Sequence, residues 1–283
     1  MTMPAMQGGP APSDAGGFDE PYLHIDAVAK DFLIGRDRVT AVRDVTLEVK
    51  RGEFVAFIGH SGCGKSTVLN MVAGVYPPSS GGIRVGGRPV SAPGPDRAMV
   101  FQSYSLLPWL TVEDNVFQAV DAVFDGQMTQ RDKRARTERF LRMVNLWEHR
   151  MKRPAEISGG MRQRTAIARA FAVKPDVLLL DEPFGALDAL TKGTLHDELL
   201  ALWRGDGRRQ TILMVTHDID EAIYLADRVM VMTDGPAATI REVISIPLSR
   251  PRNKHSTLHD PRFLELKERL FSLLQGDAMS AAS

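Results

Sequence analysis

The sequence FVAFIGHSGCGKST, residues 54–67, decides the fold of this chain. Its first five positions carry four large apolar side chains, which predicts a strand buried on both faces. Gly59 then opens the pattern G-x-x-x-x-G-K-S, which ends at Ser66. Apolar residues beyond it recur at helical spacing, at Val68, Leu69, Met71 and Val72. The stretch therefore predicts a strand, a glycine loop and a helix, which is the context of a phosphate-binding loop.

Residues 59–67 have the chemistry expected of that loop. The glycines let the backbone curl until successive N–H groups point at one centre, and the following helix adds its positive end. Lys65 would reach the β- and γ-phosphates, and the Ser66 hydroxyl would bind Mg²⁺. The alternative is a glycine-rich turn that binds nothing. We predict a nucleoside triphosphate site made by Gly59, His60, Ser61, Gly62, Cys63, Gly64, Lys65, Ser66 and Thr67.

The bulk composition argues against several classes of protein. The 283 residues include 35 Lys or Arg and 35 Asp or Glu, so the formal net charge is zero and nucleic acid is not an expected partner. A single cysteine excludes an internal disulfide and is typical of a reducing compartment. No apolar run approaches the ~18 residues of a membrane span, and no signal peptide is expected. We expect a soluble cytosolic protein that meets a membrane only through a partner.

The chain before the glycine loop divides into a tail and a β layer. Residues 1–21 are mainly small or Pro, and we expect a disordered tail there. From Tyr22 onward, apolar and polar residues alternate, which predicts half-buried strands of an antiparallel layer around residues 23–27 and 45–49. Ile83 and Val85 suggest a further strand of this layer. Residues 97–102 are typical of a buried strand that ends at Gln102.

Residues 103–175 are expected to form a helical insert. Thr111 and Thr129 are predicted N-caps, each followed by apolar residues at helical spacing. The second helix is rich in basic residues, which could suggest nucleic acid, but acidic residues interrupt the run and no aromatics interleave it. We interpret these residues as a solvated helix face: Arg131, Lys133, Arg134, Arg136, Arg139 and Arg142.

After the insert, strands alternate with helices. Helices are predicted at 194–203 and 219–226, and buried strands at 177–183, 211–216 and 228–232. This alternation predicts an α/β domain with a mainly parallel sheet, in which ligands bind at the carboxyl ends of the strands. Five residues fall at that edge, namely Gly59, Gln102, Asp181, Glu182 and His217.

Two adjacent carboxylates, Asp181 and Glu182, follow the apolar strand at 177–183. By themselves they could be a turn. Beside a phosphate loop, Asp181 would hold the Mg²⁺ shell, and Glu182 would orient and deprotonate the attacking water. His217 could be a solvated loop histidine, but at the end of the next strand it could donate a hydrogen bond to the γ-phosphate.

The stretch ISGGMRQRTAIARA, residues 157–170, predicts a second phosphate-binding helix start. Ser158 is a predicted N-cap, and Gly159 and Gly160 permit close approach of the backbone to an anion. One γ-phosphate that is already enclosed by residues 59–66 has little use for two such sites. Ser158 is therefore expected to serve the nucleotide of another copy.

Over nearly all of residues 22–235, these motifs resemble the ATP-binding cassette (ABC) family. The phosphate loop reads GHSGCGKS, the glutamine loop begins at Gln102, and the signature reads SGGMRQR. The magnesium strand reads VLLLDEP and is followed by FGALD and the switch histidine, His217. The signature departs from the common form at Ile157 and Met161, neither of which replaces a phosphate donor. The resemblance implies a P-loop NTPase core with a mainly parallel sheet, an N-terminal antiparallel β layer and an inserted α-helical subdomain.

The resemblance also implies domains and site residues. The nucleotide-binding domain would span 22–283, with a C-terminal extension at about 236–283. Phe32 fits the aromatic that stacks on adenine, and Asp188 would contribute to the nucleotide site. The residues implied for ATP hydrolysis are Glu182, His217, Gln102 and Lys65. Those implied for Mg²⁺ are Ser66, Gln102 and Asp181.

An assembly is implied as well. Two cassettes, identical or homologous, would form a head-to-tail dimer around two ATP molecules, each gripped by residues 59–67 of one subunit and 158–160 of the other. The dimer would lie peripherally at the cytoplasmic face of the inner membrane, on permease subunits served by a periplasmic binding protein. The stretch YSLLPWLTVEDNV and the closing residues look most like bacterial importers of the nitrate, sulfonate and taurine group, with a preference for the nitrate/nitrite branch. A sulfonate or taurine importer and a soluble ABC ATPase are the alternatives.

Three smaller expectations concern single features. We expect the cluster Leu106, Leu107, Pro108 and Trp109 to dock on a permease helix, the alternative being packing in the core. We expect Cys63 to be labelled by a maleimide and to be protected by MgATP. In the C-terminal extension, an apolar stripe is expected to pack on the core: Phe263, Leu266, Leu270, Phe271 and Leu274.

Overall fold

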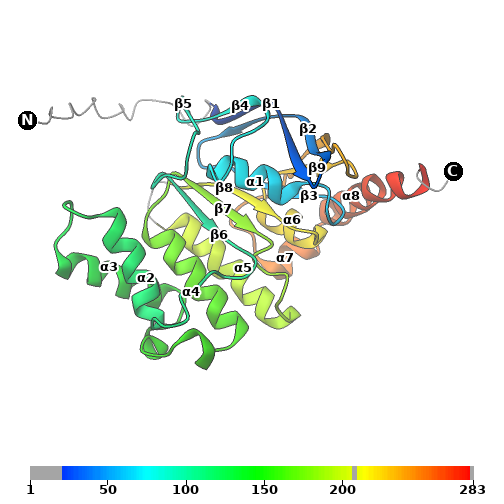
Figure 1. The fold of residues 1–283 in the computed structure, drawn as a ribbon. Coiled ribbons are helices and arrows are strands. Elements are labelled where there is room, and N and C mark those ends of the chain that lie inside the picture. Colours follow the sequence, from blue (N-terminus) through cyan, green and yellow to red (C-terminus); the bar gives the residue numbers. More distant parts are fainter. Residues whose placement is uncertain (1–20, 206–208, 281–283) are drawn as a thin grey trace, which may run out of the picture.

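The computed structural model describes residues 21–205 and 209–280. Figure 1 shows an N-terminal sheet, helix α1 beneath it, a central sheet, and further helices on the far side of that sheet. The predicted tail at 1–21 lies outside the described residues except for Pro21, which begins strand β1. The P-loop fold with an antiparallel layer and a helical subdomain is confirmed.

The N-terminal sheet is antiparallel, with the strand order β2-β1-β4-β5. Its strands are β1 (Pro21–Ile34), β2 (Asp37–Lys50), β4 (Ser80–Val85) and β5 (Arg88–Pro89). The β1–β2 hairpin is much longer than the sequence predicted, because polar residues continue the pairing beyond the buried part. The register shifts between Ile25 and Val28, where Ala27 adopts φ 44°. Ala27 is consequently exposed, and its predicted place on the buried face is wrong.

The central sheet has the order β10-β9-β3-β8-β7-β6, and every neighbouring pair except β10–β9 is parallel. Its strands are β3 (Phe54–Ile58), β6 (Arg97–Val100), β7 (Val177–Asp181), β8 (Thr211–Val215), β9 (Arg228–Met232) and β10 (Ile240–Ser245). Strand β7 ends at Asp181 and β8 at Val215, so Glu182, Pro183 and Thr216 lie beyond the strands that the prediction had assigned them to. Strand β6 lies at an edge of the sheet and only Val100 in it is fully buried, so the predicted buried strand there is wrong. The sequence analysis did not predict β10.

Strand β3 lies in the middle of this sheet, and its side chains alternate between two cores. Phe54, Ala56 and Ile58 join the cluster that contains the helices of one face. Val55 and Phe57 join the cluster that contains α1 and the antiparallel sheet. Every position of β3 is therefore buried, which is the physical reason for its unbroken apolar sequence.

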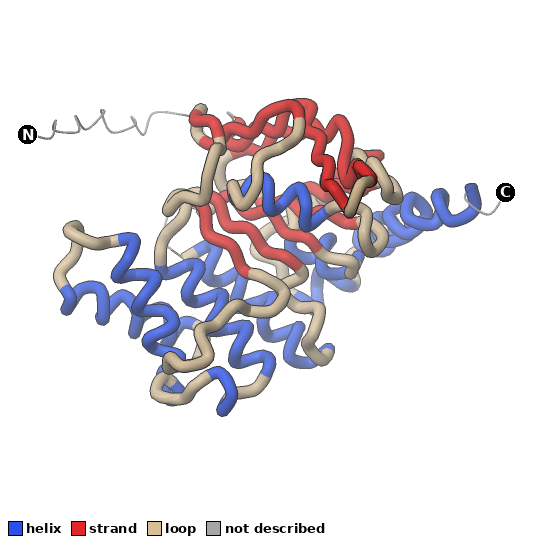
Figure 2. The backbone as a smooth tube through the Cα atoms, viewed as in Figure 1, coloured by secondary structure: helices blue, strands red, loops and turns tan. Residues whose placement is uncertain are grey.

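Helix α1 (Lys65–Ala73) lies between the two sheets, and α4 (Gly159–Ala172), α5 (Ala189–Arg204) and α6 (Ile219–Leu225) cover the other face of the central sheet (Figure 2). Helices α2 (Val112–Val123) and α3 (Gln130–Met143) pack with α4 as the helical subdomain, which also holds the short 3₁₀ turns η1 (Trp147–His149) and η2 (Pro154–Glu156). Thr111 and Thr129 cap α2 and α3, as predicted. Helix α5 begins five residues earlier than predicted, because Asp188 caps it.

The basic face predicted for α3 is only partly solvated. Lys133 is 2% exposed, and its ammonium lies 2.7 Å from the Asp121 carboxylate of α2. Arg136 donates to the Ala172 carbonyl of α4 and stacks on Phe124. These two cations hold the subdomain together, so the interpretation of the whole run as a solvated face is wrong.

The C-terminal extension continues with α7 (Lys254–Leu258) and α8 (Pro261–Ser280). Phe263 and Leu270 are buried, and Leu266 and Leu274 pack against them, as predicted. Phe271 is 53% exposed, so its predicted place in the core is wrong.

Arg252 fastens this extension to the body of the domain. Its guanidinium is buried and donates to the carbonyls of Ile223, Tyr224 and Ala226, at the C-terminal end of α6, over 2.7–3.0 Å. Burial, with a contribution from the charge of Arg250, lowers the pKa of Arg252 to about 10, so it stays charged at neutral pH. A cation at this position satisfies carbonyls that the helix leaves open and complements the helix dipole.

We predict that Arg252→Met lowers the free energy of unfolding by about 2–4 kcal/mol, because buried carbonyls lose a charged donor. Urea denaturation of the purified chain measures this change. Arg262→Met is the matched control, since Arg262 makes an exposed pair with Asp260 and its loss should change the stability much less. Equal stability of the two variants would contradict the prediction.

Candidate active site

The loop between β3 and α1 has a shape that requires glycine at two positions. Gly64 caps α1 with φ 94°, and a Cβ there would overlap the Val42 side chain. A Cβ at Gly59 would lie 2.8 Å from the Cys63 sulfur. The loop therefore wraps tightly at the N-terminus of α1, where backbone N–H groups without helical partners favour an anion.

The Lys65 ammonium is folded back over this loop. It is 5% exposed and donates to the carbonyl oxygens of Gly59 (2.7 Å) and His60 (2.9 Å). Both acceptors are neutral, whereas a phosphate oxygen would offer a charged acceptor to the same ammonium. Lys65 is thus placed to bind a phosphate within the loop.

Cys63 is buried, with 1% of its surface exposed, and packs in the core cluster that contains α1. Its sulfur lies 3.7 Å from the Lys65 ammonium. The structure therefore contradicts the expectation of ready maleimide labelling, because the thiol points into the core. A small side chain at this position simply fills the space under the loop.

Ser66 and Asp181 bring two oxygen donors together beside the loop. The Ser66 hydroxyl donates to Asp181 Oδ1 over 2.7 Å, although the two residues lie in α1 and β7. Burial raises the pKa of Asp181, and the neighbouring Glu182 charge adds to this effect, whereas Ser66 and Lys65 oppose it. Burial and a neighbouring negative charge disfavour the ionised form of a carboxyl group, and a nearby cation stabilises it.

These donors fit Mg²⁺ held jointly with phosphate. Mg²⁺ in proteins prefers oxygen ligands and is usually bound through one or two carboxylates together with substrate phosphates. Among the described residues, no group of three or more His, Cys, Asp or Glu side chains could hold a metal ion by itself. The Ser66–Asp181 pair is thus half of a site that a bound nucleotide would complete.

Glu182, Gln102 and His217 converge at the carboxyl edge of the sheet, as predicted. The Gln102 amide donates to Glu182 Oε2 over 3.1 Å, and His217 Nδ1 lies 3.5 Å from the same oxygen. They come from the ends of β6, β7 and β8, which are neighbours in the sheet. One carboxylate oxygen thus faces both an amide and an imidazole ring.

The backbone of Glu182 is held in an unusual conformation. Its φ of 45° lies in the left-handed region, and its N–H donates to the Val215 carbonyl over 2.9 Å. A non-glycine residue adopts this conformation only where its surroundings impose it, and such residues cluster at functional sites. The turn after β7 thereby aims the Glu182 carboxylate at the edge where Gln102 and His217 lie.

Residues 158–160 and Asp188 do not join this cluster. The Ser158 hydroxyl accepts from the Met161 N–H and caps α4, and Gly160 packs against Thr191 of α5. Within the described part of the chain, no hydrogen bond links residues 158–160 to residues 59–67. Asp188 caps α5, and hydrogen bonds from Thr191 lower the pKa of its carboxyl. These predicted residues therefore form a second, separate group.

Phe32 lies on β1 with 37% of its surface exposed. Its ring meets the Tyr76 ring edge-on at 5.5 Å between centroids, and the Lys30 ammonium lies over both rings. Tyr76 also bonds the Thr67 side chain, which links it to the phosphate loop. The sequence analysis missed Tyr76 and Lys30, because neither lies in a motif and only folding brings them to Phe32.

Further residues that position the site were also missed. Asp234, in the loop after β9, lies 2.6 Å from His60 Nδ1 and so braces the phosphate loop. The turn after Gln102 places Tyr104 and Ser105 at φ 64° and 45°, and Arg169 of α4 binds both of their carbonyls. The only local signal was the arginine-rich signature helix itself.

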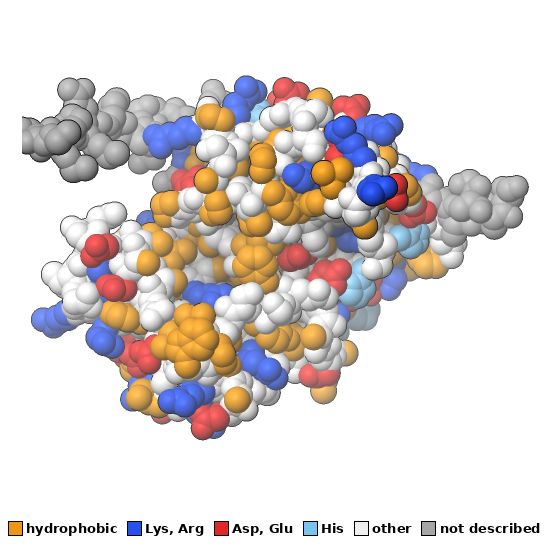
Figure 3. Space-filling view, in the orientation of Figure 1, with side chains coloured by type: hydrophobic (Ala, Val, Ile, Leu, Met, Phe, Trp, Pro, Cys, Tyr) orange, Lys and Arg blue, Asp and Glu red, His pale blue; other side chains and the backbone are white. Residues whose placement is uncertain are grey.

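The apolar cluster that follows this turn is partly on the surface. Leu106 packs against the core, whereas Trp109 is 65% exposed. Buried Asn115 of α2 shapes the cluster, since its amide bonds both the N–H and the carbonyl of Leu107. Figure 3 shows hydrophobic side chains gathered over this part of the helical subdomain. Core packing is therefore excluded for Trp109.

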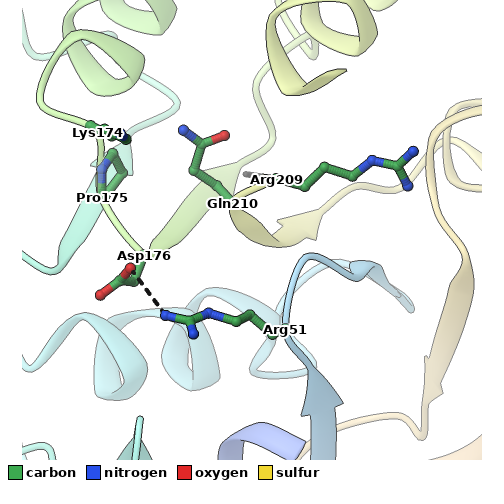
Figure 4. Close-up of a pocket in the computed structure, with 6 residues that line it drawn as sticks. All are labelled: Arg51, Lys174, Pro175, Asp176, Arg209 and Gln210. Carbon is green, nitrogen blue, oxygen red and sulfur yellow. Dashed lines mark ion pairs between the residues drawn. The ribbon is translucent and has the colours of Figure 1, made fainter. Parts of the chain in front are cut away.

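A small pocket at the opposite edge of the sheet is not a second candidate for the nucleotide site. It lies beside the amino ends of β7 and β8, where Arg51 pairs with Asp176 at 3.9 Å (Figure 4). Its enclosed space is about 20 Å³, room for about one water molecule. The other residues that line it are Lys174, Pro175, Arg209 and Gln210. None of them is a predicted site residue.

Comparisons with known proteins agree with this geometry. Residues 42–185 match the family described as "ABC transporter". The nitrate import ATP-binding protein NrtD of Synechococcus elongatus is 51% identical, over 93% of this chain and 95% of its own length. The bicarbonate transport ATP-binding protein CmpD of a Synechocystis species is 52% identical, over 87% of this chain and 86% of its own.

The solved structures give the same result. The ATP-binding cassette MJ0796, in a dimeric post-hydrolysis state bound to ADP and Pi, superposes with a TM-score of 0.71. It is 31% identical and covers 80% of this chain and all of its own. In the described residues, no helix has the length and apolar character to cross a membrane. By sequence, fold and the placing of its motifs, this chain belongs to the ABC transporter family.

Proposed function

We propose that this chain is the ATP-hydrolysing subunit of a bacterial importer that takes up nitrate. The observation that carries the catalytic part is the convergence of Gln102, Glu182 and His217 beside the phosphate loop. A carboxylate between a fixed amide and a histidine can orient a water molecule and accept its proton. A module that only bound nucleotide would need no such group.

Each residue of the site has a distinct part in hydrolysis. Lys65 and the loop N–H groups bind the β- and γ-phosphates, and Ser66 and Asp181 hold Mg²⁺ together with Gln102. Bound Mg²⁺ would neutralise charge on the phosphate oxygens. Glu182 takes the proton from the attacking water, and His217 donates to the γ-phosphate. The partly exposed rings of Phe32 and Tyr76 offer a surface for adenine.

The proposed dimer is based on residues 158–160 and Asp188, which form a group separate from the phosphate loop. Ser158, Gly159 and Asp188 carry nucleotide chemistry by resemblance, yet in the described part of the chain no hydrogen bond joins them to their own phosphate loop. A head-to-tail partner would bring them to the second nucleotide. The dimeric state of the MJ0796 structures supports this arrangement. The partner is a second copy or a homologous ATPase. A homologous ATPase of this kind is NrtC of Synechococcus elongatus, which is 48% identical over 90% of this chain.

The exposed part of the Leu106–Trp109 cluster is the proposed contact with the permease. It follows the glutamine loop directly, and Arg169 and Asn115 hold it in place. An apolar surface presented on a braced loop suits a partner helix. The chain would thus be bound at the cytoplasmic face of the inner membrane, where permease subunits receive solute from a binding protein.

The identity of the solute rests on the relatives alone. Nitrate is named for NrtD and for NasD of Klebsiella oxytoca, which is 45% identical over its whole length. Bicarbonate is named for CmpD at nearly the same identity, and the sequence analysis did not consider it. Both are small planar anions with one negative charge. Bicarbonate is therefore the second candidate.

We predict that Glu182→Gln lowers the ATPase rate by ~10²–10⁴ because it removes the general base. ATP binding should persist, and the trapped nucleotide should hold a dimer that light scattering detects. Glu242→Gln is the control, because Glu242 lies on β10 away from the site. Hydrolysis by Glu182→Gln at the parental rate would remove Glu182 from this function.

We predict that Trp109→Ala lowers transport by the reconstituted complex about 10-fold or more, because a partner contact is lost. The isolated subunit should keep its ATPase rate, and its melting temperature should change by less than about 2 °C. Leu264→Ala, at an exposed position of α8, removes an apolar side chain elsewhere and should leave transport unchanged. Full transport by Trp109→Ala would exclude this docking contact.

We predict that cells lacking the gene lose high-affinity uptake of ¹⁵N-nitrate and regain it with the parental chain but not with Glu182→Gln. Uptake of ¹³C-bicarbonate and of taurine, measured in the same cells, serves as the control. Selective loss of bicarbonate or taurine uptake would replace nitrate as the solute and leave the ATPase assignment in place.

A further inference from the structure

A buried carboxylate outside the site, Glu221, has three polar neighbours. It lies in the first turn of α6 and is 3% exposed. Glu221 Oε2 accepts from the Thr216 hydroxyl over 2.7 Å, and Oε1 accepts from the Lys192 ammonium over 2.9 Å. His196 Nε2 approaches Oε1 to 3.7 Å. A buried carboxylate is costly unless its oxygens are satisfied, and here both are.

The network around Glu221 reaches the residues on either side of His217, Thr216 directly and Asp218 through Lys192 and Thr216. The Thr216 hydroxyl, which donates to Glu221, also accepts from the Asp218 N–H over 3.0 Å. The Lys192 ammonium extends to Asp218 Oδ2 at 3.5 Å. The switch histidine itself is left free of this network, and 57% of its side chain is exposed beside Glu182. Glu221 and Lys192 thus fix the backbone of His217 through the residues that flank it, Thr216 and Asp218.

The other end of the network is the start of α5. The Lys192 N–H donates to the Asp188 carbonyl over 2.9 Å, one turn into the helix that Asp188 caps. One turn further, the His196 ring packs edge-on against Phe184 at 4.5 Å between centroids. Phe184 is fully buried and lies two residues after Glu182. The network therefore joins the segments that carry Glu182, Asp188 and His217.

Both charges of the central pair persist at neutral pH. Burial alone would raise the pKa of Glu221, but its polar neighbours His196, Lys192 and Thr216 hold it below its ordinary value. Burial would likewise lower the pKa of Lys192, but Glu221 and Asp218 raise it. A buried ion pair adds little net stability compared with apolar side chains of the same volume. Its geometry is the better explanation for its presence here.

We infer that the Lys192–Glu221 pair is a positioning device that sets His217 against Glu182 and ties it to Asp188. The inference rests on the proposed function, in which His217 contacts the γ-phosphate of its own nucleotide and Asp188 faces the partner. Lys192 and Glu221 are not among the residues proposed to contact the nucleotide or the attacking water, so they would act only through the histidine loop. Movement of Asp188 at the dimer interface would reach Lys192 through the first turn of α5. From Lys192 it would reach Thr216, next to His217, through the Lys192–Glu221 and Glu221–Thr216 hydrogen bonds.

A double-mutant cycle between Glu221 and His217 tests this inference. Glu221→Gln keeps the shape of the side chain and removes the charge that holds Lys192. We expect a ~10- to 100-fold lower kcat with little change in KM for MgATP, because a small misplacement of a positioned group is costly while the phosphate loop still binds nucleotide. In a His217→Ala background, Glu221→Gln should lower kcat no further. Single-turnover hydrolysis by the full-length chain measures the slow variants.

Two controls separate positioning from general stability. Lys267→Met breaks an exposed ion pair with Asp220 on the same helix α6 and should leave kcat unchanged. Lys192→Arg keeps the charge and should retain most of the rate, whereas Lys192→Met should match Glu221→Gln. If Glu221→Gln does not fold, the same cycle with Lys192→Met replaces it.

The outcomes are distinct. Effects of Glu221→Gln and His217→Ala that multiply, or a parental kcat in Glu221→Gln, would overturn the inference. A parental chain that hydrolyses no ATP would instead overturn the proposed function. A His217→Ala variant with the parental rate would remove His217 from hydrolysis and the inference with it.

Discussion

Burial of β3 on both faces is the constraint on which the rest of the structure depends. Phe54, Ala56 and Ile58 anchor the helices of one side, and Val55 and Phe57 anchor α1 and the antiparallel sheet of the other. The phosphate loop leaves the end of this strand, so its position is fixed by two cores at once. A glycine-rich loop has little rigidity of its own. The packing of β3 and α1 supplies it.

The parallel order of β3, β8, β7 and β6 turns this anchoring into a site. Each strand ends at the same edge, so side chains far apart in sequence come within hydrogen-bond distance of one another. Ser66 meets Asp181, and Gln102 and His217 meet Glu182. The unusual backbone of Glu182 is held by the neighbouring strand, through the Val215 carbonyl. Catalytic geometry is thus a property of the sheet.

The helical parts extend the site in two directions. Arg169 and Asn115 brace the glutamine loop and the Leu106–Trp109 cluster against the helical subdomain. Lys192 and Glu221 link the starts of α5 and α6 behind the histidine. In both cases buried polar side chains tie a loop to a helix, and such bonds are costly to break in a low-dielectric interior.

The sequence by itself determined the chemistry of the motifs and the elements that carry them. Glycine spacing, apolar runs and N-caps are local signals, which is why the strand, loop and helix around residues 59–67, the Thr111 and Thr129 caps and the place of the carboxyl-edge residues were predicted correctly. Tertiary structure alone decided that β6 is an edge strand, that Lys133 is buried, that Cys63 faces the core, and that Tyr76, Asp234 and Glu221 support the site. Each of these depends on contacts between different elements of the chain. Burial and pairing are set by which surfaces meet after folding, and no local pattern of residues encodes that meeting.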